Sequence, residues 1–214
     1  MLKLYSYYRS SAAYRVRIAL HWKELPFEYI PVHLVKAGGE QHGSQYRKVN
    51  PMGHVPALDD NGFLVAESVA IIRYLDDICP GRPLFPSDPQ GRAKVLQICE
   101  VINSGIQPLQ NLKVTQALER DFHLSPSEVE RWTRHWITSG LQNLEQILES
   151  TAGSFCYKGR ITAADCFLVP QCFSARRFGV RVEEFPTIAR IERRAAAQEA
   201  FIKAHPEKQP DFTV

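Results

Sequence analysis

A cluster of prolines divides the chain into two parts of different character. Pro80, Pro83, Pro86 and Pro89 fall within ten residues. Proline lacks a backbone N–H and fixes φ, so neither a helix nor a central strand accommodates such a density. Strand-like and helix-like segments alternate before the cluster, and the chain after it has helical patterning. The sequence of 214 residues therefore predicts two domains, over residues 1–82 and 88–214.

The first part is predicted to be a small α/β domain. Short apolar or β-branched runs indicate strands, and an apolar stripe through Val16, Ala19 and Leu20 indicates a helix. Two strands joined through a helix are expected to be parallel, whereas Asn61-Gly62 is typical of a hairpin. We expect strands at residues 3–5, 27–32, 57–58 and 63–65, and helices at 11–23 and from 67 to before 80. This order is βαβ followed by ββα, a mixed four-stranded sheet.

The second part is predicted to be all-helical. Apolar residues between positions 95 and 106 trace one helix face, and Pro108 should kink that helix near Gly105. Further helix starts are predicted at Ser125-Pro126-Ser127-Glu128, at Thr162-Ala163-Ala164-Asp165 and after Pro186, the last helix ending near residue 200. The first two have the spacing of a capping box, in which a hydroxyl and a carboxylate satisfy the first backbone N–H groups.

Composition and charge exclude several classes of function. The chain has 26 Lys and Arg against 23 Asp and Glu, a net charge of +3, and no basic block typical of nucleic-acid binding. No apolar run approaches the ~18 residues of a spanning helix, and residues 1–4 do not form a secretory leader. The five cysteines form no CxxC pair and the histidines are scattered, so no metal site is expected. We therefore expect a cytoplasmic protein that binds neither nucleic acid nor a membrane.

Arg9-Ser10-Ser11 leads from the first strand into the first helix and is a candidate anion site. Two hydroxyls and several unpaired backbone N–H groups lie there at the positive end of a helix dipole. A thiol bound at this position would have a lowered pKa, because the thiolate accepts hydrogen bonds. The alternative is that one of the serines only caps the helix.

Two further segments suit a peptide ligand. Val55-Pro56 precedes a predicted strand, and a cis bond there would leave the Val55 N–H and C=O for an extended peptide, although few X–Pro bonds are cis. Glu67-Ser68 opens a helix and suits an ammonium and a carboxylate, or is a solvated helix start. A peptide with an amino group, a carboxylate and a thiol would use all three sites. Glutathione is such a peptide.

A series of motifs runs in order through nearly the whole chain. They are Tyr7-Tyr8-Arg9-Ser10-Ser11-Ala12-Ala13-Tyr14-Arg15-Val16-Arg17-Ile18-Ala19-Leu20, Asn50-Pro51, Val55-Pro56, Glu67-Ser68-Val69-Ala70-Ile71-Ile72, Gly105-Ile106-Gln107-Pro108-Leu109-Gln110-Asn111-Leu112, and Ala163-Ala164-Asp165-Cys166 with Leu168-Val169-Pro170-Gln171. This series resembles that of the zeta-class glutathione transferases, the maleylacetoacetate isomerase family.

The resemblance implies a thioredoxin-like first domain that binds glutathione, a helical second domain that forms the substrate pocket, and a homodimer. It also implies that Ser10 and Ser11 stabilise the glutathione thiolate, and of the two we favour Ser10. The implied glutathione contacts are Ser10, Ser11, Gln41, Val55, Glu67 and Ser68 in the first domain, and Gln107 and Asn111 in the second. The Thr162 and Asp165 pair matches a helix start of the wider family and is expected to be structural.

The implied activity is glutathione-dependent cis–trans isomerisation of a maleyl diketo acid, in the first place maleylacetoacetate to fumarylacetoacetate. Thiolate addition makes the double bond a single bond, rotation follows, and elimination restores a trans alkene. Arginine matches the carboxylates of such a substrate, and Arg9 and Arg177 are the candidates. Arg15 is expected to face the helix exterior or an ion pair, and Arg176 to be solvated.

One departure from the family bears on the alternatives. Many zeta-class members have Cys where this chain has Ala12, so no protein thiol can assist the chemistry here. This weakens a dehalogenase more than an isomerase. A maleylpyruvate isomerase of gentisate breakdown, a transferase that conjugates or dehalogenates small electrophiles, and a non-catalytic binding module remain as alternatives. The intact peptide site argues against the last of these, and the lack of cysteine at the helix start excludes a thioredoxin-like reductase.

Overall fold

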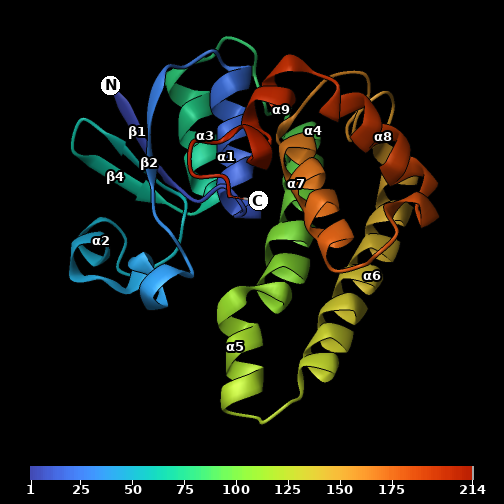
Figure 1. Ribbon diagram of the computed structural model, residues 1–214. Helices are drawn as coiled ribbons and strands as arrows, with labels where there is room; N and C mark the ends of the chain where they lie inside the picture. The colour runs from blue at the N-terminus through green and yellow to red at the C-terminus, as the bar shows by residue number, and fades with distance from the viewer. Residues whose placement is uncertain (214) are drawn as a thin grey trace. The chain divides into compact units, whose positions relative to one another are not determined.

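The structure, a computed structural model, describes residues 1–213 and divides into two compact units. The first comprises residues 1–84 and the C-terminal segment 197–213, and the second comprises residues 85–196. Figure 1 labels the helices of both units and the strands β1, β2 and β4. Over residues 1–213, no helix is both long and apolar enough to cross a membrane.

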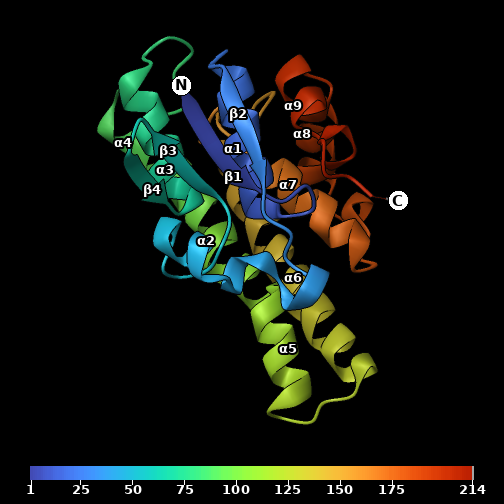
Figure 2. The same cartoon turned by 60° about the vertical axis from the view of Figure 1, so that its left-hand side comes forward.

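The first unit is built on a four-stranded sheet with the order β2-β1-β3-β4 (Figure 2). β1 (Leu2–Ser6) and β2 (Phe27–Pro31) are parallel, while β3 (Ala57–Asp60) pairs antiparallel with both β1 and β4 (Phe63–Ala66). Asn61 and Gly62 form the turn of the β3–β4 hairpin with φ values of 52° and 96°. Asparagine and glycine adopt positive φ at low cost, which is why this pair marks a hairpin. The predicted mixed sheet is confirmed.

α1 (Ser11–Trp22) is buried along most of its length. α3 (Ser68–Ile78) and α9 (Glu199–Ala204) both pack against it, so it is covered on more than one side. Two arginines of this helix, Arg15 and Arg17, are almost completely buried. Buried cations are costly unless they are hydrogen-bonded, and the partners of these two lie in the segments that carry the candidate site.

The C-terminal segment departs from the prediction. The last helix does not run unbroken from residue 186 to 200, because α8 (Pro186–Ala196) ends and α9 begins after Gln198, whose backbone is extended. Phe201 and Ala204 of α9 are buried, and Arg17 Nε donates to the carbonyl of Ala204 at 3.0 Å. Residues 197–213 therefore group with the first unit, and the range 88–214 expected for the second domain is longer than the second unit.

Lys23 at the end of α1 forms a buried ion pair with Asp76 of α3, with 2.6 Å between Nζ and Oδ1. Nζ also donates to the carbonyl of Cys79, and Asp76 Oδ1 accepts from the N–H of Leu84. The two charges thus satisfy backbone groups at the end of α3 and in the proline-rich segment. Removing either partner would take the closest counter-charge away from a buried charge, so we expect the pair to be important for the stability of this unit.

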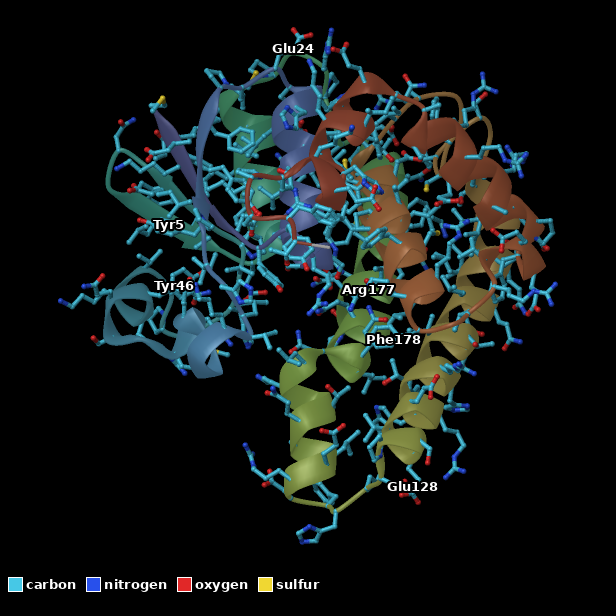
Figure 3. All side chains as sticks on the ribbon, viewed as in Figure 1. Tyr5, Glu24, Tyr46, Glu128, Arg177 and Phe178 are labelled. Carbon is cyan, nitrogen blue, oxygen red and sulfur yellow. The ribbon has the colours of Figure 1, made fainter. Side chains whose placement is uncertain are left out.

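α2 (Ser44–Val49) is a short helix that the sequence did not predict. It lies between β2 and β3 and follows two turns of 3₁₀ helix at Lys36–Gly38 and Glu40–His42. Tyr46 packs against Tyr5 of β1, with the ring centroids 5.9 Å apart, and these two side chains are labelled in Figure 3. The helix has six residues, too few for a clear hydrophobic period, so only its packing identifies it.

The second unit is all-helical, as predicted. α4 (Pro89–Glu100) continues into a π-helical turn (Val101–Ile106) and a 3₁₀ turn (Gln107–Gln110), and this change of geometry is the interruption expected near Gly105. The remaining elements are α5 (Leu112–Arg120), α6 (Pro126–Thr151), α7 (Ala163–Arg177), a 3₁₀ turn (Val182–Glu184) and α8. α6 and α7 begin at the predicted capping boxes. Buried Asp165 accepts from the N–H groups of Thr162 and Cys156 at 2.8 and 2.9 Å, an arrangement that suits the structural role expected of it.

Candidate active site

The strand register brings three loops of the first unit to one end of the sheet. Tyr5 of β1 is the partner of Ala57 in β3, and Ala57 is the partner of Ala66 in β4. The loop after β1, the residues just before β3 and the residues just after β4 therefore all lie at the same end of the strands. These loops contain Arg9, Ser10, Ser11, Val55, Glu67 and Ser68, six of the residues singled out in the sequence.

Ser10 is the N-cap of α1. Its backbone is extended, with φ −69° and ψ 117°, and its Oγ accepts from the N–H of Ala13 at 3.2 Å. A serine hydroxyl has two acceptor lone pairs and one donor, so the cap leaves the Ser10 O–H free to donate. The capping role and the anion-binding role that the sequence offered as alternatives are thus compatible at this residue.

The start of α1 is electrostatically suited to an anion. The N–H of Tyr14 goes to the Ser10 carbonyl and that of Ala13 to Ser10 Oγ. The two earlier N–H groups of the helix, at Ser11 and Ala12, have no intrahelical acceptor. The first turn contains no acidic residue, so the positive end of the helix dipole is not neutralised from within. An anion placed here would receive backbone N–H groups and the Ser10 hydroxyl together.

Arg9 precedes the cap and lies over two aromatic rings. Its guanidinium carbon is 5.9 Å from the ring centroids of both Tyr7 and Tyr8. Tyr7 and Tyr8 are buried in a cluster with Val32, Tyr46 and Val55. Burial raises the pKa of Tyr7, and the positive charge of Arg9 acts in the opposite direction. The rings hold a half-buried cation beside the helix start.

Val55 lies in the same apolar cluster as Tyr7, which joins the first two loops. The Val55–Pro56 bond is cis, one of the two possibilities considered from the sequence. The preceding carbonyl, of His54, accepts from the Tyr46 hydroxyl at 2.6 Å and from Asn50 Nδ2 at 2.8 Å. Two side chains therefore fix the backbone that leads to Val55.

Ser68 is joined to α1 by a hydrogen bond that sequence reasoning missed. Arg15 Nη1 donates to Ser68 Oγ at 3.0 Å, and both residues are buried. Of the two environments that the sequence suggests for Arg15, the helix exterior or an ion pair, the first is therefore wrong. Its partner lies in α3 because the two helices pack side by side. The guanidinium places a positive charge at the start of α3, and Ser68 still has its own O–H to donate.

Glu67 caps α3 in an unusual backbone conformation. It has φ 69° and ψ 119°, which lies outside the small left-handed region open to ordinary residues. Its side chain is exposed. Such conformations cost of order 1–3 kcal/mol and tend to occur at functional sites. The carboxylate is thus presented to solvent at the same end of the sheet as Ser10.

Gln41 is buried, and its side-chain oxygen accepts no hydrogen bond from the protein. Its Nε2 donates to the carbonyl of Leu34 at 3.1 Å, while its Oε1 is buried without a partner. Gly39, with φ 99°, allows this packing, because a Cβ there would lie 2.4 Å from the Gln41 amide nitrogen. Leu34 follows β2, whose last residue, Pro31, is the partner of Ser6. The unsatisfied amide oxygen therefore also belongs to this end of the sheet.

Three expected site residues lie in the second unit. Gln107 is in the 3₁₀ turn after the π-helical turn, and Asn111 caps α5 by accepting from the N–H of Lys113 at 3.1 Å. Arg177 is exposed at the end of α7 and lies 5.5 Å from the ring centroid of Phe178 (Figure 3). Arg176 instead pairs with Glu192 at 2.7 Å and Glu183 at 2.9 Å. The hydrogen bonds that Arg176 donates to Glu192 raise the pKa of its guanidinium, so Arg176 already has carboxylate partners within its own unit.

Comparison with known proteins gives consistent matches. Residues 4–83 match the N-terminal domain of glutathione S-transferases. Over 208 residues, which are 97% of this chain and 89% of that protein, the chain is 50% identical to the probable maleylacetoacetate isomerase 2 of Drosophila melanogaster.

Two solved structures share the fold over 99% of this chain. One is the holo structure of a bacterial zeta-class maleyl pyruvate isomerase, with a TM-score of 0.94, 34% identity and all of that chain covered. The other is the maleylacetoacetate isomerase of Anaeromyxobacter dehalogenans with glutathione in its active site, with a TM-score of 0.89, 41% identity and 97% of that chain covered.

We expect Glu67→Gly to stabilise the protein, because glycine relieves the strain of positive φ. The gain is reduced by the larger conformational entropy of glycine in the unfolded chain, and about 1 kcal/mol in the free energy of unfolding should remain. Glu67→Ala is the matched control, since it removes the carboxylate but keeps a Cβ. Urea denaturation measures both, and equal stabilities of the two variants would contradict the assignment of strain.

Proposed function

The chain belongs to the zeta class of the glutathione transferases, the maleylacetoacetate isomerase family, and we propose that it isomerises maleylacetoacetate to fumarylacetoacetate with glutathione as cofactor. One structural observation carries the proposal. A helix N-terminus with a free hydroxyl donor, a cis-proline loop and a buried serine–arginine pair converge at one end of the sheet. Each accepts a different group of the same small peptide.

The residues fit glutathione by their hydrogen-bonding capacity. Ser10, with Ser11, would hold the thiolate, and the backbone of Val55 would pair with the peptide. Ser68, with Arg15 behind it, suits a carboxylate, and Glu67 suits the ammonium. The unpartnered oxygen of Gln41 provides an acceptor that the protein itself leaves unused. We also assign Gln107 and Asn111 to glutathione binding, since they occupy the matching positions of the family motif.

When bound, glutathione supplies a thiolate that adds to the conjugated double bond and leaves again after rotation. The protein has to keep that sulfur ionised and the substrate oriented. The dipole of α1 and the Ser10 hydroxyl favour the charged sulfur. Arg9, steadied by two tyrosine rings, and Arg177 match the substrate carboxylates. Ala12 at the helix start adds no thiol of its own, so the protein acts through charge and position.

Maleylpyruvate is the second candidate substrate, because the chain is also similar to a maleyl pyruvate isomerase, with a TM-score of 0.94. Both diketo acids have the same reacting alkene and differ in the tail beyond it. A transferase activity on small electrophiles would use the same Ser10 site but consume glutathione. Cofactor stoichiometry therefore separates the isomerase from the transferase, and relative rates separate the two isomerases.

The test is isomerisation followed by absorbance, with each diketo acid and with a catalytic amount of glutathione or none. We expect many substrate molecules to be converted per glutathione, no conversion without it, and a faster rate with maleylacetoacetate. One product molecule per glutathione would identify a transferase. A protein that binds glutathione but converts neither acid would contradict the proposal.

Ser10→Ala should reduce kcat about 100-fold, the usual effect of losing a donor to a reacting anion. It also removes the cap, which costs about 1 kcal/mol of stability. Ser10→Thr keeps both the hydroxyl and the cap and is the control. The affinity for glutathione should change little in either variant, because the other contacts remain. An unchanged kcat in Ser10→Ala would indicate that Ser11 or the backbone N–H groups stabilise the thiolate instead.

Arg9→Ala and Arg177→Ala should each weaken binding of the diketo acid by about 2 kcal/mol, or about 30-fold in KM, as expected for a charged hydrogen bond. Arg176→Ala is the matched control, since its guanidinium is held by Glu183 and Glu192. Steady-state kinetics measure all three. If KM rose only in Arg176→Ala, the assignment of Arg9 and Arg177 to the substrate carboxylates would be wrong.

We propose that the protein is a homodimer. Met52, Phe63 and Leu64 of the first unit expose between 42% and 60% of their surface, and two of them lie on the edge strand β4. Exposed apolar side chains on an unpaired edge favour contact with another chain. Light scattering should give twice 24.4 kDa, and a mass of one chain would refute the dimer.

We further propose the cytoplasm as its compartment. All five cysteines are free thiols, and four of them are buried. Free thiols of this kind suit a reducing environment. Cell fractionation checks this, and recovery with secreted proteins would contradict it.

A further inference from the structure

The loop from Tyr7 to Ser10 carries the proposed catalytic groups, yet part of its anchoring comes from the distant C-terminal segment. The N–H of Tyr8 donates to Asp211 Oδ2 at 3.0 Å. The other oxygen, Oδ1, accepts from the hydroxyl of Tyr29 in β2 at 2.6 Å. Both carboxylate oxygens are therefore used, one on the loop and one on the sheet.

Arg17 holds the carbonyls of the same loop. Its Nη1 lies 3.3 Å from the Tyr7 carbonyl and its Nη2 lies 3.0 Å from the Tyr8 carbonyl. Its Nε reaches the carbonyl of Ala204 at 3.0 Å, so the same guanidinium ties the loop to α9. Burial lowers the pKa of Arg17 to about 10. The negative charge of Asp211 acts in the opposite direction and raises it. Arg17 stays a cation at neutral pH.

The aromatic contacts continue this connection. The ring of Tyr8 packs edge-on against Phe212, with 5.5 Å between centroids, and its hydroxyl is 3.5 Å from the carbonyl of Thr213. The same ring lies under Arg9. Ser10 is coupled to the loop in turn, because its N–H donates to the Tyr7 carbonyl at 3.0 Å.

We propose that Asp211 is a positioning residue for the active site, which through the Tyr8 N–H and Tyr29 fixes the loop that presents Arg9 and Ser10. This inference rests on the proposed function, since it assigns those two residues to substrate and cofactor. Asp211 acts through hydrogen-bond geometry. A displacement of about 1 Å in a catalytic group can cost up to 100-fold in rate, so a small shift of this loop is sufficient.

Two substitutions at this position separate geometry from charge. Asp211→Asn removes the charge but keeps both bonds, because Oδ1 can accept from the Tyr8 N–H and Nδ2 can donate to the Tyr29 oxygen. Asp211→Glu keeps the charge but moves the carboxylate by one methylene. Glu207→Ala is the control, since Glu207 is an exposed carboxylate of the same segment, and its side chain lies 3.9 Å from His205 Nδ1.

The readouts are kcat/KM for maleylacetoacetate, the pKa of bound glutathione from the ultraviolet absorbance of its thiolate, and the affinity for S-methylglutathione. For Asp211→Glu we expect kcat/KM to fall about tenfold and the thiol pKa to rise by about one unit, a tenfold change in ionisation. The affinity for S-methylglutathione should stay within about twofold, because Asp211 accepts hydrogen bonds from Tyr8 and Tyr29, and the proposed peptide contacts Gln41, Val55 and Ser68 lie in other segments. Asp211→Asn and Glu207→Ala should resemble the wild type in all three readouts.

The opposite pattern, in which Asp211→Asn is impaired and Asp211→Glu is active, would contradict the proposal that Asp211 acts through hydrogen-bond geometry. So would unchanged kinetics and thiol pKa in both variants, or a fall in S-methylglutathione affinity that matches the fall in kcat/KM. If the wild type neither binds glutathione nor isomerises the diketo acid, the proposed function has failed by itself. In that case, amide hydrogen exchange of residues 7–10 without ligand tests whether Asp211 fixes the loop. We expect protection to be lost in Asp211→Glu and kept in Asp211→Asn.

Discussion

The pairing of Tyr5 with Ala57, and of Ala57 with Ala66, determines where everything else in the first unit can lie. A shift of one residue in either pairing would turn each side chain to the opposite face of the sheet. It would also separate the helix start at Ser10 from the loop at Val55 and the helix start at Ser68. The site is therefore a consequence of backbone register, to which the individual side chains add specificity.

Buried cations are the second element on which the unit depends. Lys23, Arg15 and Arg17 all belong to α1 or its end, and each donates to groups in a segment distant in sequence. Burial makes these contacts obligatory, because an unpaired charge in the interior would be far more costly than an exposed one. The arginines thus connect the helix that carries the proposed thiolate site to α3 and to the C-terminal segment, and they place positive charge near the proposed peptide site.

Ser10 caps α1 and is also the residue to which we assign the thiolate. Its acceptor lone pair caps α1 and its donor remains for the ligand. In the proposed reaction the sulfur comes with glutathione, so the protein needs no nucleophile of its own, and Ala12 adds no thiol at the helix start. What the fold contributes is a fixed electrostatic environment, in which Arg9 lies over two tyrosine rings next to the capped helix.

The sequence by itself determined the order of the four strands and of the longer helices, the proline-rich division, both capping boxes and the identity of the loops that meet at the candidate site. It could do so because proline, capping and hydrophobic period act over a few residues. It did not reveal α2, the break between α8 and α9, the contact of Arg15 with Ser68 or the bond from Asp211 to Tyr8. Those features depend on residues from 8 to 203 positions apart coming into contact. Only the packed tertiary structure decides such partners, because a buried charge or a short helix is stable just where another segment supplies its hydrogen bonds or covers its apolar face.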